Sequence, residues 1–217
     1  MTDIAPLFES NRAWAANKVR ADPGFFDRLA HQQNPAYLWI GCADSRVPAN
    51  EIVGLDPGEL FVHRNVANLV HPADMNCLAV LQYAIEFLKV KHVIVTGHYG
   101  CGGVRAAMQP EQLGLIDHWL RPIRDTHEKN RAELLAIVDE YKRLNALCEM
   151  NVREQVFNLA KTTIVQNAWH RGQELSLHGW VYGLSNGLVR DLGVTISGSE
   201  MLAESFRTAL PQLASAS

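Results

Sequence analysis

Several features of membrane, secreted and nucleic-acid-binding proteins are missing from this 217-residue chain. No apolar run approaches the roughly 18 residues that cross a bilayer, which argues against a membrane span. The opening segment MTDIAPLFESNRAW carries Asp3 and Glu9 and no apolar signal core, so a cytoplasmic protein is expected. Lys and Arg number 20 against 23 Asp and Glu, a net charge of −3. A nucleic-acid or membrane-surface partner is therefore not expected, because both require a concentrated basic field.

The chain is also poor in cysteine, with four, and it lacks linkers, repeats and low-complexity tracts. Without a visible secretion signal, these thiols are expected to be reduced. Hydrophobic residues at 47% and charged residues at 20% are typical of a globular protein and exclude a disordered chain. A chain of this length buries a large core without a structural metal, so a metal here would serve chemistry. We expect a single domain over residues 1–217, with an N-terminal helical arm over about residues 1–30.

Short apolar segments alternate with helical patterns along the chain. Buried strands are predicted at residues 36–40, 60–64 and 92–96, and helical spacing spans residues 76–89. Residues 175–182 predict another strand, and the hairpin signal after it indicates that residues 188–190 return antiparallel. The pattern predicts an α/β fold with a mostly parallel central β-sheet, an antiparallel edge strand and flanking helices.

Helices are also predicted outside these strands. The ranges are 8–20, 102–108, 131–148, 151–169 and 199–210. Asn151 with Glu154 resembles a capping box, so a helix is expected to begin at Asn151. Ser199 is the expected cap of the last helix, and the residues after Pro211 are expected to form a loose tail.

Two polar motifs directly follow predicted strands. Cys42-Ala43-Asp44-Ser45-Arg46 follows the first strand, and His98-Tyr99-Gly100-Cys101 follows the third. If the strands are neighbours, Cys42, His98 and Cys101 converge at the carboxyl edge of the sheet, where ligands bind. Two thiolates and an imidazole suit Zn²⁺, and three protein ligands leave a fourth position open for water or substrate.

Asp44 has two possible roles in this arrangement. It lies two residues from Cys42 and could be a fourth metal ligand that closes the site. It also lies two residues from Arg46, whose planar fork binds carboxylates. If it pairs with Arg46, Asp44 stays ionised and can accept a hydrogen bond from a reacting water.

The sequence resembles β-class carbonic anhydrases over residues 29–210. The motifs CADSRV (42–47) and GHYGCGG (97–103) look like the two zinc-binding signatures of that family, and PGELFVHRNVAN (57–68) and LHGWVYG (177–183) continue the resemblance. The resemblance implies one Zn²⁺ per chain and reversible hydration of CO₂ to bicarbonate and a proton. Its implied site residues are the zinc ligands Cys42, His98 and Cys101, and the dyad Asp44 and Arg46.

The resemblance also implies a small apolar pocket for CO₂, which has no charge and little hydrogen-bonding power. Phe61, Val66 and Tyr83 would line it, with Gln33 as a polar contact, offered within the chain or by a neighbouring subunit. The Gly102 backbone N–H can approach a bound oxyanion, because no Cβ obstructs it.

A second anion pocket is suggested by Trp39, Arg64 and Tyr182, which resemble the non-catalytic bicarbonate site of some bacterial members. Arg64 can offer a fork to a planar oxyanion, and the two aromatic side chains can each donate a hydrogen bond. We therefore expect regulation by pH and bicarbonate. The resemblance further implies a homodimer, or a homotetramer built from two dimers, with the N-terminal helix packing on its neighbour.

Two other functions are compatible with the same residues. Hydrolysis of COS or CS₂ would use the same metal centre with different access to the pocket. A non-catalytic zinc or bicarbonate-sensing protein is the second alternative. The presence of both Asp44 and Arg46 argues against a sensor, because a sensor needs no dyad to orient water.

Overall fold

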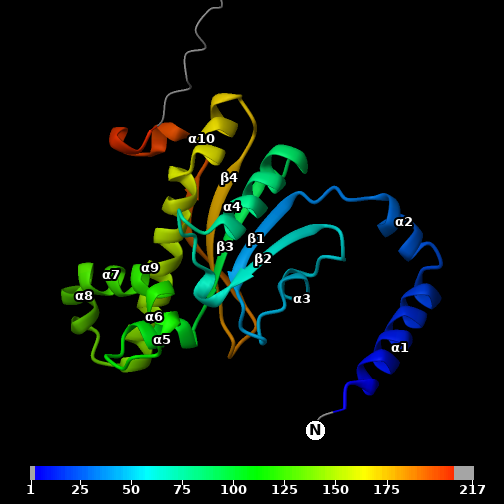
Figure 1. Ribbon diagram of the computed structural model, residues 1–217, viewed down its shortest axis with the longest axis horizontal. Coiled ribbons are helices and arrows are strands. Elements are labelled where there is room, and N and C mark those ends of the chain that lie inside the picture. The colour runs from blue at the N-terminus through cyan, green and yellow to red at the C-terminus, as the bar shows by residue number, and fades with distance from the viewer. Residues whose placement is uncertain (1–2, 208–217) are drawn as a thin grey trace, which may run out of the picture. The chain divides into compact units, whose positions relative to one another are not determined.

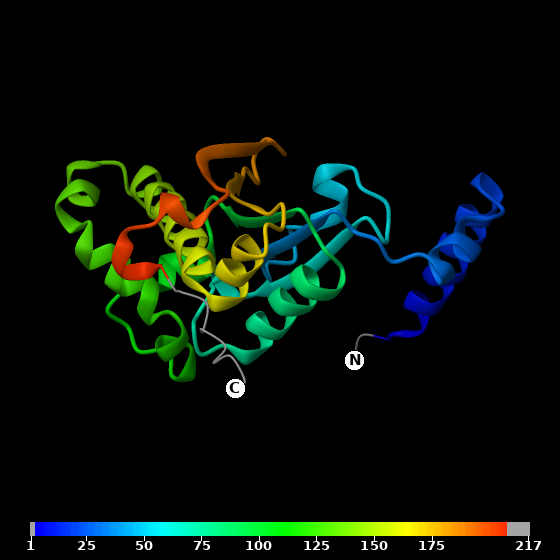
Figure 2. The same cartoon turned by 90° about the horizontal axis from the view of Figure 1, so that it is seen from above.

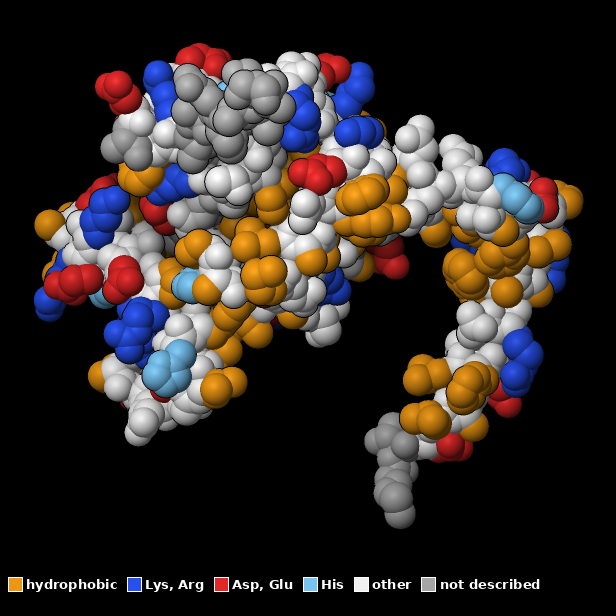
Figure 3. Space-filling model, turned by 45° about the horizontal axis from the view of Figure 1, so that its top comes forward, with side chains coloured by type: hydrophobic (Ala, Val, Ile, Leu, Met, Phe, Trp, Pro, Cys, Tyr) orange, Lys and Arg blue, Asp and Glu red, His pale blue; other side chains and the backbone are white. Residues whose placement is uncertain are grey.

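The computed structural model describes residues 3–207, and it divides the chain into two compact units, residues 1–34 and 35–217. The first unit contains α1 (Ala5–Ala21) and α2 (Phe25–His31), so the helix predicted at 8–20 is confirmed. The rings of Trp14 and Phe26 join the two helices edge to face, with centroids 5.7 Å apart. No α1 residue is buried, and its hydrophobic side chains stand exposed (Figure 3). Among the described residues, no helix combines the length and apolarity that a membrane span needs.

The second unit is built on a five-stranded sheet with the order β2-β1-β3-β4-β5 (Figure 1). The first four strands run parallel and β5 pairs antiparallel with β4, so the predicted α/β fold with an antiparallel edge strand is confirmed. The strands are β1 (Tyr37–Cys42), β2 (Leu60–Asn65), β3 (His92–His98), β4 (Ser176–Tyr182) and β5 (Val189–Ile196).

Helices α4 (Met75–Gln82), α9 (Glu140–Lys161) and α10 (Thr163–His170) cover one face of the sheet (Figure 2). Glycine lets α9 approach the strands closely. A Cβ built on Gly97 of β3 would lie 2.6 Å from a Val152 methyl carbon, far inside normal contact. The opposite face packs against α3 (Ala49–Val53). The main core therefore lies between the sheet and α9.

A second hydrophobic core lies beyond the carboxyl ends of β1 and β3. It gathers Cys42 and Cys101 with buried leucines from the helical middle of the chain. The helices around it are α5 (Gly102–Ala107), α6 (Leu115–Trp119), α7 (Arg121–Lys129) and α8 (Arg131–Ala136).

The predicted helices 131–148 and 151–169 have the wrong boundaries. Helix α8 ends at Ala136, and the Asp139 side chain caps α9 by accepting a hydrogen bond from the Lys142 N–H. Helix α9 then runs through Asn151, which is 1% exposed and caps nothing. The next helix begins instead behind Thr162, whose hydroxyl accepts from the Val165 N–H. The resemblance to a capping box misled the prediction, because that pattern also occurs inside long helices.

Two other helix predictions change. In the segment predicted at 76–89, α4 ends at Gln82 and continues as the π-helical turn η2 (Tyr83–Phe87). The helix predicted at 199–210 is replaced by the 3₁₀ turns η3 (Ser199–Met201) and η4 (Glu204–Phe206), because Leu202 between them is extended and buried in the main core. Residues 208–210 and the expected tail lie outside the described residues. A third 3₁₀ turn, η1 (Val66–Asn68), follows β2.

Candidate metal centre

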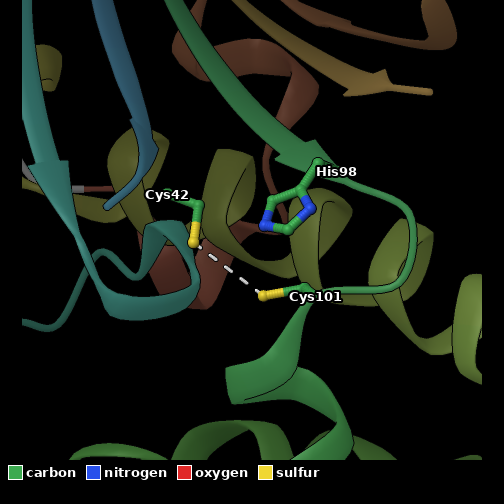
Figure 4. A group of neighbouring side chains, drawn as sticks. All are labelled: Cys42, His98 and Cys101. Atoms are coloured by element: carbon green, nitrogen blue, oxygen red, sulfur yellow. Dashed lines mark hydrogen bonds between the residues drawn. The ribbon is translucent and has the colours of Figure 1, made fainter. Parts of the chain in front are cut away.

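Three predicted ligands meet where neighbouring strands end. Cys42 is the last residue of β1, His98 is the last residue of β3, and Cys101 precedes the first turn of α5. Their ligand atoms all lie within 4.8 Å of one another, and all three side chains are buried. Figure 4 shows the two sulfur atoms, 3.9 Å apart, with the imidazole ring beside them. The geometry therefore brings together the predicted soft donor set.

The orientation of His98 fits this group to a metal ion. Its Nδ1 lies 3.1 Å from the Tyr99 carbonyl oxygen, which can only accept, so Nδ1 carries the proton. Nε2 consequently presents a lone pair toward the thiols. That atom is buried and has no hydrogen-bond partner among the described residues, an arrangement that costs free energy unless a ligand occupies it. Cys42, Cys101 and His98 Nε2 form a donor set suited to Zn²⁺.

The two thiols are electrostatically unequal. The hydrogen bond that Cys101 donates lowers the pKa of Cys42 against the opposing effect of burial, and the neighbouring backbone N–H groups of Asp44 and Ala67 act in the same direction as Cys101. The same shared bond, together with burial, raises the pKa of Cys101. The site therefore stabilises the first thiolate on Cys42, and a cation would have to displace the proton on Cys101.

Asp44 pairs with Arg46 in this structure. Oδ1 accepts from Arg46 Nε at 2.9 Å and Oδ2 accepts from Nη2 at 2.7 Å, a bidentate arrangement. This hydrogen bonding holds the pKa of Asp44 well below its usual range. Oδ2 also lies 3.6 Å from His98 Nε2, so the ionised carboxylate borders the metal centre. Of the two predicted roles, the structure shows the arrangement on Arg46.

The side chains predicted to line a CO₂ pocket come from three elements: Phe61 from β2, Val66 from η1 and Tyr83 from η2. The rings of Phe61 on β2 and Tyr83 in the π-helical turn lie 5.9 Å apart, and Val66 is 38% exposed. Val66 also lies against the first turn of α5, since a Cβ on Gly103 would lie 3.0 Å from its methyl carbon. A Cβ at Gly102 would meet no atom of the described residues within 4 Å, so packing within residues 3–207 does not require glycine there. Gln33 belongs to the N-terminal unit and is exposed.

Strand register places Trp39, Arg64 and Tyr182 on one face of the sheet. Trp39 is buried, and its Nε1 has no hydrogen-bond partner among the described residues. Glycine at position 41 makes room for this indole, because a Cβ there would lie on Nε1. Arg64 already has partners: its Nε donates to the Cys42 carbonyl oxygen at 2.9 Å, and its Nη2 donates to the Asp44 carbonyl oxygen. Arg64 thus contacts the backbone of the segment that contains Cys42 and Asp44, and the sequence did not predict this contact.

The sequence also did not predict which residues hold the loop between His98 and Cys101. Tyr99 donates from its hydroxyl to Glu149 at 2.7 Å, and Arg190 of β5 donates to the same carboxylate at 2.8 Å. The Gly100 N–H donates to Asn145 at 3.1 Å. Asn145 and Glu149 lie four residues apart on α9, so one helix face fixes the loop between His98 and Cys101. The spacing of Asn145 and Glu149, four residues apart in a predicted helix, was the sequence signal that could have indicated this contact.

A second group of possible ligands comprises His63, Asp74 and Cys77. Asn65 argues against a metal there. Its amide exchanges hydrogen bonds with both the N–H and the carbonyl of Leu69, so the amide orientation is fixed and its nitrogen donates to His63 Nε2. Burial raises the pKa of Cys77 to about 12, which disfavours the thiolate. Cys77 and Cys148 are both buried, as predicted.

Comparison with known proteins points to the same family as the sequence motifs. A family model described as carbonic anhydrase matches residues 37–189. The chain is 52% identical over 192 residues to a carbonic anhydrase of Emericella nidulans, a match that covers 88% of this chain and 84% of that protein.

Solved structures agree with the sequence comparison. A Coccomyxa β-carbonic anhydrase in complex with acetazolamide superimposes with a TM-score of 0.87 and 42% identity, covering 93% of this chain and 91% of that one. A tetrameric β-carbonic anhydrase from Sordaria macrospora gives a TM-score of 0.84 with 39% identity, covering 88% of this chain and 97% of that one.

Proposed function

Because this chain belongs to the β-class of carbonic anhydrases, enzymes that hydrate CO₂, we propose that Cys42, His98 and Cys101 bind one catalytic Zn²⁺. The observation that carries the proposal is the buried, unpartnered lone pair of His98 Nε2 beside two thiols. When bound, Zn²⁺ would supply the Lewis acidity that makes a hydroxide nucleophile available near neutral pH.

Asp44 and Arg46 would orient the reacting water. Arg46 keeps the Asp44 carboxylate ionised, and Oδ2 faces the centre, where it can accept a hydrogen bond or a proton. An acceptor fixed at this position selects one orientation of the nucleophile, which lowers the entropic part of the barrier. Asp44 and Arg46 are thus the proposed catalytic side chains.

CO₂ would bind beside them on apolar surface. Phe61 and Val66 would supply that surface together with the ring of Tyr83. The Gly102 N–H and the amide of Gln33, from this chain or a neighbouring subunit, are the proposed polar contacts. Access to this pocket would separate the alternatives, because COS and CS₂ are larger than CO₂.

Regulation by bicarbonate would act through the pocket of Trp39, Arg64 and Tyr182. An anion bound by the Arg64 fork competes with the carbonyl oxygens of Cys42 and Asp44 for its N–H groups. Loss of these bonds would free the Asp44 backbone, so that its carboxylate could turn from Arg46 and become a further metal ligand, the proposed closed state. Bicarbonate shifts this equilibrium only if it binds the closed state better. High pH would favour the open state, in which Asp44 pairs with Arg46, because hydroxide would compete with the carboxylate for a bound metal.

The proposed assembly is a homodimer or a pair of dimers in the cytoplasm. The tetrameric relative from Sordaria macrospora and the exposed apolar side chains of α1 support contacts between copies. A single catalytic domain with residues 1–30 as a helical arm is consistent with the two compact units. Four free cysteines suit a reducing compartment.

Stopped-flow CO₂ hydration with a pH indicator, before and after removal of metal by a chelator, tests the function directly. We expect activity to disappear with the metal and to return with one equivalent of Zn²⁺ per chain. Full activity in metal-free protein would refute the zinc assignment. A zinc-loaded protein that turns over COS or CS₂ but not CO₂ would favour the hydrolase, and one that binds bicarbonate without turnover would favour the sensor.

A further inference from the structure

One peptide group lies between His98 and the long helix α9. The Tyr99 carbonyl oxygen accepts from His98 Nδ1 at 3.1 Å, and the Gly100 N–H donates to Asn145 Oδ1 at 3.1 Å. This carbonyl and this N–H belong to the same planar trans peptide, so they point in opposite directions. The peptide is therefore held from both sides, by the imidazole on one and by Asn145 on the other.

Steric exclusion does not fix the orientation of this peptide. Gly100 has a φ of 68°, a left-handed conformation that glycine adopts without strain. Glycine adopts a negative φ equally well, so the peptide can rotate about its flanking bonds without meeting a Cβ at residue 100. Such a rotation would turn the Tyr99 carbonyl away from His98 Nδ1. Hydrogen bonding therefore has to select the observed orientation.

The other contacts of Tyr99 leave this rotation open. Its N–H donates to the Tyr182 carbonyl oxygen at 3.0 Å, and its hydroxyl donates to Glu149 at 2.7 Å. Both bonds hold parts of Tyr99 that precede the peptide in question. The hydrogen bond from the Gly100 N–H to Asn145 acts on the rotating peptide itself.

The orientation of the peptide decides which nitrogen of His98 carries the proton. A carbonyl oxygen at Nδ1 places the proton there and leaves a lone pair on Nε2. That Nε2 atom is buried beside two thiols and has no hydrogen-bond partner among the described residues. If the carbonyl turns away, the proton can move to Nε2, which then has no lone pair to offer a metal ion.

We propose that Asn145 is a positioning residue of the metal centre: through the peptide that follows Tyr99, it keeps His98 in the tautomer that presents Nε2 to the metal. The inference rests on the proposed zinc function, because it takes His98 as a zinc ligand. Partners that hold a histidine ligand from outside fix its tautomer and ring orientation, and their loss weakens metal binding by roughly 10- to 100-fold.

The test measures the tautomer of His98 and the affinity for Zn²⁺ in the same variants. Asn145→Leu keeps the approximate size of the side chain and offers no acceptor to Gly100. Asn158→Leu is the matched control, since Asn158 is a half-buried asparagine of the same helix that donates to the Val70 carbonyl oxygen. Long-range proton–nitrogen NMR spectra of the metal-free full chain report which ring nitrogen carries the proton. They are recorded at pH 8.5, about two pH units above the usual imidazole pKa. Competition with a chelator measures zinc binding.

The parent and Asn158→Leu should hold the proton of His98 on Nδ1 alone. Asn145→Leu should show both tautomers and bind Zn²⁺ about tenfold more weakly. A single Nδ1–H tautomer in Asn145→Leu, or an unchanged zinc affinity, would overturn the inference. A parent that binds no zinc would instead overturn the proposed function, and the comparison of tautomers does not depend on that result.

Two further measurements keep the inference testable if Asn145→Leu does not fold. Asn145→Asp keeps an acceptor for the Gly100 N–H, so it should retain the tautomer of the parent. Hydrogen exchange of the Gly100 amide is measured in the unaltered chain, where its bond to Asn145 should make exchange slow. Exchange at the rate of an unprotected amide, or loss of the single Nδ1–H tautomer in Asn145→Asp, would overturn the inference.

Discussion

The candidate metal centre and the proposed bicarbonate site of Trp39, Arg64 and Tyr182 differ in one respect. The binding groups of the first are already oriented toward a common point, whereas those of the second are partly occupied by other hydrogen bonds. At the metal centre, three ligand atoms converge within 4.8 Å, and His98 is held in one tautomer by the Tyr99 carbonyl. In the proposed bicarbonate site, Trp39 Nε1 lacks a hydrogen-bond partner within residues 3–207, while the Arg64 fork donates to the backbone carbonyls of Cys42 and Asp44. A metal ion at the first site would displace a proton from Cys101 and leave the ligand side chains where they are, whereas an anion at the second would have to displace the hydrogen bonds of Arg64.

That difference is consistent with the different physical tasks proposed for the two groups of residues. A catalytic centre gains from groups that are already oriented, because no reorganisation is then required during the reaction. A regulatory site must have two arrangements that differ by a few kcal/mol, since only then can a ligand change their populations. The bonds from Arg64 to the carbonyls of Cys42 and Asp44 connect the two sites, so changes in one should be read out in the other.

The largest effect is expected from removing a ligand of the preassembled centre. Cys42→Ala and Cys101→Ala should each lose bound zinc and with it CO₂ hydration, because two remaining ligands hold zinc poorly. Metal analysis of the purified proteins measures this loss. Cys77→Ala is the matched control: it removes a buried thiol outside the centre and should keep one zinc per chain. Retention of zinc in both ligand variants, or its loss in the control, would contradict the assignment.

A large but different effect is expected at Asp44. Asp44→Asn should keep the metal on its three ligands and lower CO₂ hydration by about 10²-fold or more, because an amide cannot take up the proton that the carboxylate accepts. Zinc content and stopped-flow rates are measured on the same preparation. Near-normal turnover in the zinc-loaded variant would exclude Asp44 from proton handling and leave it a structural partner of Arg46.

A conditional effect is expected at Arg64. Titration with bicarbonate at fixed pH should inhibit the parent more strongly than Arg64→Ala, in which the second pocket has lost its fork. The parent should also gain activity with pH more steeply than one ionisation allows. Bicarbonate is also the reaction product and should inhibit both proteins at the active site. The measured quantity is therefore the additional inhibition of the parent over Arg64→Ala. Arg121→Ala, an exposed arginine at the start of α7, serves as control. Identical bicarbonate curves and identical single-proton pH profiles in parent and Arg64→Ala would remove the regulatory role.

The elements that sequence predicted well are those whose signals are local. Strand prediction succeeded because buried runs such as residues 92–96 are apolar and bounded by turns. The convergence of Cys42, His98 and Cys101 followed from a topological rule about the carboxyl ends of parallel strands. Helix boundaries near residue 151 failed because Asn151 suits a helix start in local pattern, whereas its actual partner is the Ala67 carbonyl, 84 residues away in sequence.

The unpredicted part of the site is made of backbone groups. The carbonyl oxygens of Cys42 and Asp44 that accept from Arg64 are groups present in every residue type, so no sequence pattern marks them. The left-handed turn at Ala67 and Asn68 is equally hidden, because neither residue is a glycine. Such contacts follow from how two distant elements pack and become visible only in the folded chain.

The smallest expected effect lies outside both sites and separates regulation from simple acid unfolding. His178 Nε2 lies 3.1 Å from His92 Nδ1, and its Nδ1 lies 3.1 Å from the Thr195 hydroxyl. Burial, followed by repulsion from His92, lowers the pKa of His178 below its usual value, and Asp191 opposes the shift. The unfolded chain therefore binds a proton first, so the stability that His178 contributes is complete above about pH 6.5 and falls as the pH drops toward the folded-state pKa.

Denaturant titrations at pH 7.5 and pH 5.5 should show a smaller loss of unfolding free energy in His178→Gln, whose amide does not titrate, than in the parent or in the exposed control His170→Gln. If acid lowers activity equally in parent and His178→Gln while stability changes only in the parent, the activity loss comes from the Asp44 equilibrium. Equal losses of stability in all three proteins would instead show that the His92–His178 pair does not contribute to acid sensitivity.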